Sequence, residues 1–141
     1  MNKEKVFVRL AEPSDIEFVG QDGYIPKEIV QRKIRDDEIF LLLVEGQPAG
    51  YLRIEFLWSL VPFISLIIIQ ESYRKKGYSR LLVDHVKDHL RAKGYGILYS
   101  SSQLDEPQPQ AWHRHMGFEE CGVINGINEG GIGEVFFRLA L

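Results

Sequence analysis

The sequence predicts an α/β (α+β) domain with a mixed central sheet of about seven strands, flanked by about four helices. The first observation is a strand-like apolar run, Phe63–Ile69, followed by a basic loop, an amphipathic helix pattern and a short strand candidate, Ile97–Ser101. This β-α-β order predicts parallel strands. The second observation is a pair of apolar segments around the turn-like sequence Glu45–Pro48, which predicts an antiparallel hairpin. Parallel and antiparallel pairing together predict a mixed sheet.

The N-terminal half begins with a predicted strand, Val6–Leu10, and the following Pro13 and Ser14 are typical of a helix start. A second helix is predicted after Tyr24, Ile25 and Pro26, and its apolar stripe consists of Ile29, Val30 and Ile34. The hairpin strands Ile39–Glu45 and Ala49–Trp58 follow. A turn is then predicted at Pro62, before the strand that starts at Phe63. The sequence therefore predicts two helices and four strands in this half, and the sequence signal for the two helices is weak.

The C-terminal half opens with a strong helix pattern, Arg80–Lys93, which ends before Gly94. Its apolar face consists of Leu82, Val83, Val86 and Leu90. The remaining predicted elements are the strand Ile97–Ser101, a short helix opened by Pro107 and Pro109 and ending at Met116 and Gly117, the strands Glu119–Ile124 and Glu134–Leu139, and a glycine-rich hairpin loop, Asn125–Gly133, between them.

Composition narrows the class of protein. A chain of 141 residues with 45% hydrophobic and 26% charged residues predicts a single globular domain, residues 1–141. The formal net charge of −3 argues against a general nucleic-acid binder, which needs a basic surplus.

The longest apolar run, Phe56–Ile69, is too short to span a membrane. A lone cysteine, Cys121, excludes an intrachain disulfide, predicts a cytoplasmic location, and is expected to be a buried core residue.

The segment Gln70–Ser79 joins the apolar strand to the strong helix and carries the most informative chemistry. Arg74, Lys75 and Lys76 precede Gly77 there, and Arg80 follows. The first N–H groups of a helix lack partners within it, and together with the helix dipole they attract phosphate. Bases beside a helix start are unfavourable unless an anion binds. The segment therefore predicts a ligand that carries phosphate, and the alternative is a basic loop that is simply solvated.

Two motifs resemble those of the GCN5-related N-acetyltransferase (GNAT) family. Arg74, Gly77 and Ser79 resemble the Arg/Gln-x-x-Gly-x-Gly/Ala loop that holds the pyrophosphate of acetyl-coenzyme A (acetyl-CoA), with Ser79 at a position where Gly or Ala is usual. Trp112–Phe118 resembles the family's later helix, which ends in a Gly-Phe pair before a strand. The predicted order β-α-α-β-β-β-α-β-α-β-β is that of the family's acyl-CoA N-acyltransferase fold, so the resemblance covers essentially the whole chain.

The resemblance implies acetyl-CoA as co-substrate and no metal. It implies that the backbone of Ile67, Ile68 and Ile69 binds the pantetheine arm, and the Ile69 backbone is also a candidate to bind the developing oxyanion. The side chains alone indicate only that this strand is buried. The loop residues implied to bind the cofactor are Arg74, Lys75, Lys76, Gly77, Tyr78, Ser79 and Arg80.

The resemblance also implies direct transfer, in which a neutral amine attacks the thioester and the sulfur leaves as a thiolate that needs a proton. The family's usual proton donor is a Tyr four residues before the Gly of the Gly-Phe pair, and His113 stands there. An imidazole can donate a proton near neutral pH, so His113 is the candidate general acid. The alternative is a structural histidine that covers the short helix.

Glu55 is the candidate general base, on the same pleat face as Tyr51 and Arg53. The alternative is a solvent-facing carboxylate on an amphipathic strand. Glu71, Asp105 and Glu106 are candidates for an acidic mouth that attracts a cationic acceptor. His85 and His89 stand one helical turn apart, but they lack a third ligand and the Glu of a zinc-protease pattern, which favours a surface or semi-buried pair over a metal site.

The sequence thus predicts an N-acetyltransferase that moves an acetyl group from acetyl-CoA to a primary amine, with no nucleic-acid or membrane partner. The alternatives are a non-catalytic CoA-binding or sensor module with the same fold, and a protein-interaction domain. The acceptor is undetermined, because variable loops, here Phe18–Ile29 and Asn125–Gly133, build acceptor pockets in this fold. A homodimer through the terminal strands is consistent with the fold.

Overall fold

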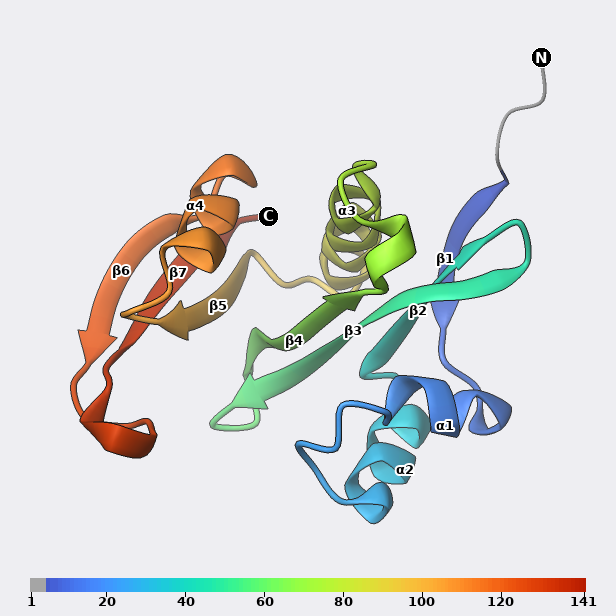
Figure 1. Ribbon diagram of the computed structural model, residues 1–141, viewed down its shortest axis with the longest axis horizontal. Helices are drawn as coiled ribbons and strands as arrows, with labels where there is room; N and C mark the ends of the chain where they lie inside the picture. Colours follow the sequence, from blue (N-terminus) through green and yellow to red (C-terminus); the bar gives the residue numbers. More distant parts are fainter. Residues whose placement is uncertain (1–4) are drawn as a thin grey trace. The chain divides into compact units, whose positions relative to one another are not determined.

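The structure is a computed structural model that describes residues 5–141. Within these residues, seven strands form one mixed sheet in the order β1-β2-β3-β4-β5-β7-β6 (Figure 1). The elements are β1 (Val6–Leu10), α1 (Ile16–Val19), α2 (Lys27–Arg35), β2 (Ile39–Val44), β3 (Gln47–Leu57), β4 (Val61–Ile69), α3 (Tyr78–Ala92), β5 (Ile97–Gln103), α4 (Pro107–His115), β6 (Glu119–Ile124) and β7 (Glu134–Ala140). The predicted fold class and element order are confirmed.

The chain divides into two compact units, each described separately. The first contains residues 5–54 and 66–88, and the second contains Glu55–Ser65 and His89–Leu141. In the first unit, β2 pairs antiparallel with both β1 and β3. All six residues of β2 are apolar and buried, so both faces of this strand are covered.

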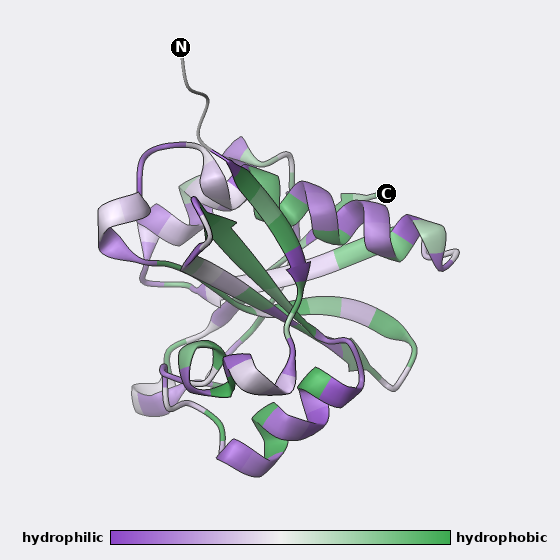
Figure 2. Cartoon of the chain, turned by 90° about the vertical axis from the view of Figure 1, so that its right-hand side faces the viewer, coloured by the Kyte–Doolittle hydropathy of each residue, from purple (hydrophilic) through white to green (hydrophobic). Residues whose placement is uncertain are grey.

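Helices cover opposite faces of the sheet in the first unit. Ile39 and Leu41 belong to a buried cluster with Val30 and Ile34 of α2. On the other face, the ring of Phe40 lies 5.9 Å from that of His85 on α3. Figure 2 shows the hydrophobic strands between helices that present hydrophilic residues to solvent. This layering follows from the apolar stripes on the helices.

The second unit has a simpler arrangement. β7 pairs antiparallel with β5 on one side and with β6 on the other. The parallel ladder between β4 and β5 consists, among the described residues, of Phe63 with Tyr99 and Ile64 with Ser100. Side chains along β5 alternate between buried and half-buried, as expected for a strand covered by a helix on one face.

The turn predicted at Pro62 is wrong. Pro62 lies inside β4, and the chain reverses at Trp58 and Ser59, whose φ angles are +52° and +65°. Neither residue is a Gly or Asn, so the usual sequence sign of such a turn is absent. The β4–β5 ladder begins only at Phe63, so the missing N–H of Pro62 removes no bond to β5.

Cys121 is exposed, and its predicted burial is therefore wrong. It lies on β6, which is the last strand of the sheet and has exposed side chains throughout. The register between β6 and β7 shifts between Glu120 and Gly122, so Cys121 is the extra residue of a β-bulge. Partial burial raises the pKa of the thiol above its ordinary value, and the positive charge of Arg138 acts in the opposite direction.

Candidate active site

The predicted phosphate loop forms one continuous exposed segment between β4 and α3. Gln70 is followed by a single 3-10 turn, Glu71–Tyr73, and α3 begins at Tyr78. Lys75 has a φ of +62° and Gly77 a φ of +81°. Left-handed residues turn the backbone so that N–H groups can face one side of a loop, and such concave arrangements of N–H groups bind anions. Gly77 adopts this conformation without strain.

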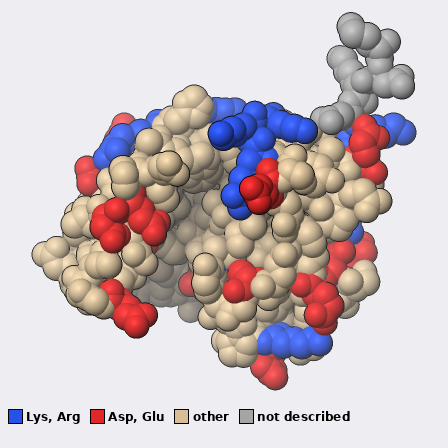
Figure 3. Space-filling model, viewed as in Figure 1, with Lys and Arg blue, Asp and Glu red and all other residues tan. Residues whose placement is uncertain are grey.

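The side chains of this loop supply positive charge. Arg74, Lys75, Lys76 and Arg80 are all exposed. Figure 3 shows Lys and Arg side chains gathered over this end of the first unit. Tyr78 is buried instead, with its ring 6.4 Å from that of Tyr73. The structure therefore brings the predicted loop residues together, with four bases outside and Tyr78 holding the helix start in place.

Arg74 connects the loop to the end of β4. Its Nε–H donates a hydrogen bond of 2.8 Å to the carbonyl oxygen of Ile69. Ile67, Ile68 and Ile69 are half-buried and lie outside the β4–β5 ladder of Phe63 and Ile64. Their proposed contacts with a pantetheine arm stay predictions.

Gly50 on β3 permits a close approach that was not predicted. A Cβ at this position would stand 2.6 Å from the carbonyl oxygen of Ile68 and 2.8 Å from Cδ1 of Ile69. Any side chain larger than hydrogen would therefore push β4 away from β3. A glycine inside a strand pattern is a sign of such an approach, so the sequence contained this signal.

His113 is buried, with 4% of its surface exposed, and both ring nitrogens have partners. Nδ1 lies 2.7 Å from the carbonyl oxygen of Pro109, and Nε2 lies 2.7 Å from the hydroxyl of Ser100. A carbonyl only accepts, so Nδ1 carries the proton, and in the neutral ring Nε2 accepts from Ser100. The ring also stacks on Phe137 at 4.4 Å between centroids.

This environment favours the neutral imidazole. Burial lowers the pKa of His113 and outweighs the Pro109 hydrogen bond and the Glu134 charge, which act to raise it. The ring thus covers the inner face of α4 with both nitrogens engaged, as the structural alternative predicts. A role for His113 as general acid stays a prediction.

Glu55 is exposed, whereas Tyr51 and Arg53, four and two residues earlier on the same pleat, are buried. The solvent-facing position expected for Glu55 is therefore found at the end of β3, whereas the middle of the strand is buried on both faces. The role of Glu55 as general base stays a prediction.

A buried ion pair anchors the loop between α1 and α2, and sequence reasoning missed it. The Nη1 and Nη2 atoms of Arg53 donate to the two carboxylate oxygens of Asp22 at 2.6 and 2.9 Å. The Tyr51 hydroxyl donates to Asp22 at 2.7 Å, and Arg53 Nη1 also donates to the carbonyl of Val19 at 3.2 Å. The side chains of Arg53 and Asp22 are only 4% and 2% exposed.

The electrostatics of this cluster are strongly coupled. Burial acts to raise the pKa of Asp22, but hydrogen bonds from Arg53 and Tyr51 outweigh it and hold the pKa well below the usual range. Burial and the hydrogen bond to Asp22 raise the pKa of Tyr51. Asp22 is therefore ionised and Tyr51 neutral at physiological pH. The 31-residue separation of Asp22 and Arg53 gives no local sequence signal.

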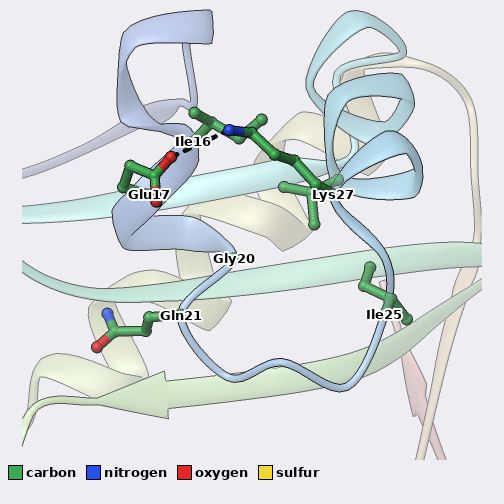
Figure 4. A pocket seen from close by; sticks show the side chains of 7 residues that line it. Ile16, Glu17, Gly20, Gln21, Ile25 and Lys27 are labelled. Carbon is green, nitrogen blue, oxygen red and sulfur yellow. Dashed lines mark hydrogen bonds and ion pairs between the residues drawn. The ribbon is translucent and has the colours of Figure 1, made fainter.

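A small pocket of about 150 Å³ lies between α1 and α2 (Figure 4). An ion pair between Glu17 and Lys27, 3.2 Å apart, stands at its rim. The lining residues are Ile16, Glu17, Gly20, Gln21, Ile25, Lys27 and Val30. The pocket lies within Phe18–Ile29 and its flanks, one of the two segments predicted to build an acceptor site.

Residues 5–141 contain neither a cluster of candidate metal ligands nor a helix that could span a membrane. In this part of the chain, no three His, Cys, Asp or Glu side chains gather as a metal site. No helix there is long and apolar enough to cross a membrane. The predictions of no metal, of a single domain and of a homodimer stay predictions.

Solved structures share this fold. Ard1 from Thermoplasma volcanium superposes with a TM-score of 0.83 at 15% identity, over 96% of this chain and 97% of its own. A candidate streptothricin acetyltransferase from Bacillus anthracis, solved with acetyl coenzyme A, superposes with a TM-score of 0.67 at 17% identity, over 73% of this chain and 61% of its own. These likenesses place the chain in the class of proteins with the acetyltransferase fold.

Sequence comparisons specify the family. Residues 7–118 match the model of the acetyltransferase (GNAT) family, and the chain belongs to this family. Streptothricin acetyltransferase from Streptomyces lavendulae is 27% identical over 121 residues, which are 84% of this chain. The chain spans 60% of the length of that relative. The resemblance to the GNAT family is thus confirmed.

Proposed function

We propose that this protein is an N-acetyltransferase that moves an acetyl group from acetyl-CoA to a primary amine by direct transfer in a ternary complex. The observation that carries the proposal is the loop before α3, where left-handed backbone at Lys75 and Gly77 lies among four exposed bases. Membership of the GNAT family supports the same assignment.

The proposed roles follow the predicted residues. The loop from Arg74 to Arg80 binds the pyrophosphate, and the backbone of Ile67–Ile69 binds the pantetheine arm. The amine nitrogen forms a bond to the acetyl carbon, the C–S bond breaks, and its electron pair stays on sulfur. His113 remains the proposed donor to that thiolate, and Glu55 the proposed acceptor of the amine proton.

The decisive experiment is calorimetric titration of acetyl-CoA and of dephospho-CoA into the wild type, Gly77→Glu and Gly94→Glu. Gly94 is a matched control, because its φ is +90°, like the +81° of Gly77, and a Cβ added at either glycine would meet no atom within 4 Å. We expect Gly77→Glu to weaken acetyl-CoA binding at least about tenfold and Gly94→Glu to leave it unchanged. Absence of binding by the wild type overturns the proposal.

A non-catalytic CoA-binding module is the second candidate, and the engagement of both nitrogens of His113 favours it. Release of free thiol from acetyl-CoA should be followed with streptothricin, an alanyl peptide and a lysine amide as acceptors. Streptothricin is included because of the named activity of the Streptomyces lavendulae relative. Turnover of any of them excludes the second candidate, whereas binding without turnover supports it.

A further inference from the structure

The last strand of the second unit has a free edge. Among the described residues, β6 has β7 as its one neighbour in the sheet, and all six of its residues are exposed. In an edge strand, the N–H and C=O groups of alternate residues point away from the sheet and can pair with another extended chain. The bulge at Cys121 interrupts this edge, so its regular part consists of Gly122, Val123 and Ile124.

Large apolar side chains border this free edge. Val123 and Ile124 are 42% and 46% exposed, and Leu104, directly after β5, is 47% exposed. A Cβ added at Gly133 would stand 3.3–3.4 Å from the Ile124 carbonyl oxygen and from the side chains of Leu104 and Val123, so these residues adjoin one another. Ile127 on the β6–β7 loop is 56% exposed. Contiguous exposed apolar residues of this kind mark interaction sites. These four apolar residues form the edge patch: Leu104, Val123, Ile124 and Ile127.

Hydrogen bonds fix the β6–β7 loop beside the edge patch. Nδ2 of Asn128 donates to Oε1 of Glu134 at 2.9 Å and to the carbonyl oxygen of Gly133 at 3.3 Å. The other carboxylate oxygen of Glu134 accepts a hydrogen bond of 2.6 Å from the hydroxyl of Ser101 on β5. Because the loop is already bonded to the start of β7, a ligand need not order it on binding.

The four Lys and Arg residues of the second unit lie toward the start of β6, away from the edge patch. In the β6–β7 ladder, Arg138 pairs with Glu119, the first residue of β6. The guanidinium carbon of Arg114 lies 5.9 Å from the ring centre of Phe137, one residue earlier on β7. The other two bases precede β5, whose start pairs with the end of β7: Arg91 and Lys93.

Acidic residues lie at the opposite end of the strands, with the edge patch. Glu134 pairs with Ile124 in the β6–β7 ladder. Exposed acids at this end follow Leu104 directly or lie on the β6–β7 loop: Asp105, Glu106 and Glu129. Figure 3 shows acidic side chains at the end of the second unit that carries this loop. Within the second unit, the charge that borders the edge patch is therefore negative.

We propose that the edge patch and the free edge of β6 bind an extended basic segment of another protein. The segment adds a short strand beside Gly122–Ile124, and its apolar side chains cover the edge patch. Its Lys and Arg side chains lie among the acids, where the charges are complementary. An extended chain suits this surface, because successive side chains project to opposite sides and so separate apolar from charged contacts. The site uses none of the residues of the loop before α3 and does not depend on acetyl transfer.

A second copy of the chain fits this surface less well. A two-fold contact between two β6 strands is isologous, so each copy presents the same residues to the other. The acids beside one edge patch would then face the acids beside the other, and like charges repel. A basic segment meets opposite charge instead.

The test uses a short fluorescent peptide of alternating arginine and valine, blocked at both ends. It carries no primary amine, so acetyl transfer cannot contribute to the result. Anisotropy titration should show binding to the wild type. Replacing each valine of the peptide by serine keeps its charge and should weaken binding at least about tenfold, because the apolar contacts are lost. Raising the salt from about 0.1 M to 1 M should weaken binding as well, because the charges are screened.

Two variants of the protein test the two parts of the surface. Ile124→Lys removes an apolar contact and adds a like charge, and should weaken peptide binding at least about tenfold. Its matched control is Phe7→Lys, at an exposed apolar residue of β1, the strand at the other end of the sheet. Glu129→Lys should also weaken binding, whereas Glu28→Lys, at an exposed acid of α2, should leave it unchanged. Circular dichroism and thermal unfolding confirm that the compared proteins are folded.

Hydrogen exchange locates the bound peptide. Binding should slow the exchange of backbone N–H groups in β6, because groups at the free edge gain partners. Equal peptide binding by the wild type and Ile124→Lys, or unchanged exchange in β6, overturns the inference. Absence of binding by the wild type also overturns it. A wild type that sediments as a dimer, which Ile124→Lys dissociates, assigns the edge to a second copy and overturns it too. None of these outcomes changes the acetyl-CoA titration, so the proposed function stands or falls separately.

Discussion

The two units each contain a buried polar network, and the networks differ in charge. In the first unit, ionised Asp22 holds Arg53 and Tyr51, and both charged side chains are at most 4% exposed. In the second unit, neutral His113 joins the Ser100 hydroxyl to the Pro109 carbonyl. An ion pair loses far more when one partner is removed, because the remaining charge stays buried. The comparison therefore predicts different costs for similar substitutions.

The largest effect is expected for Asp22→Asn. The substitution keeps the shape of the side chain but leaves the Arg53 guanidinium buried without a counter-charge, which should cost about 3 kcal/mol or more of unfolding free energy. Urea unfolding measures it. Glu17→Gln is the control, because it breaks an exposed ion pair with Lys27 and should cost at most about 1 kcal/mol. A loss for Asp22→Asn as small as that of the control would contradict the predicted difference.

Ser100→Ala should have an intermediate effect. It leaves Nε2 of His113 buried without a donor, which should cost about 1–3 kcal/mol. Adding His113→Phe removes the unpaired nitrogen, so the double variant should lose less than the sum of the single losses. Urea unfolding of all three variants completes the cycle. Strict additivity would show that the Ser100–His113 hydrogen bond does not stabilise the fold.

The smallest expected effect is the pH dependence of the unfolding free energy, which should differ between the two networks. His113 has a lowered pKa in the folded state, so the unfolded chain binds the extra proton first, and stability should fall as pH drops below about 6.5. Asp22 also has a lowered pKa, and its contribution is present above about pH 3.9 and is lost as pH falls further. Both slopes are limited to about 1.4 kcal/mol per pH unit per proton.

Thermal unfolding between pH 7 and pH 5 tests this assignment. His113→Phe should flatten the decrease in that range, while Asp22→Asn should leave the decrease in place. An unchanged slope in His113→Phe would assign the pH dependence to other groups.

Local patterns predicted most of the fold. The predicted bounds of β1 and β6 agree with the structure, and α3 begins at Tyr78 instead of Arg80. These elements are specified by the spacing of their apolar residues and by glycines that end a helix, such as Gly94 after α3. Both signals depend only on residues that are close together in the sequence. The same holds for the loop before α3, because a basic glycine-containing segment at a helix start is recognisable without knowledge of distant residues.

Long-range contacts were beyond this reasoning. Asp22 meets Arg53 across 31 residues, and Ser101 meets Glu134 across 33. His113 was recognised by its position in a motif, but its burial depends on Ser100 and on the ring of Phe137. Pairings of this kind are set by strand register and loop path, which a pattern of apolar residues constrains only weakly.

The β-bulge of β6 gives the protein a built-in labelling position. Cys121 is the sole thiol of the chain and is exposed, so a maleimide dye or spin label attaches at one known place without engineered cysteines. The thiolate is the reactive form, and the raised pKa of Cys121 means that coupling accelerates as the buffer is made more alkaline. A probe placed there reports from the second unit while ligands are titrated against the loop of the first.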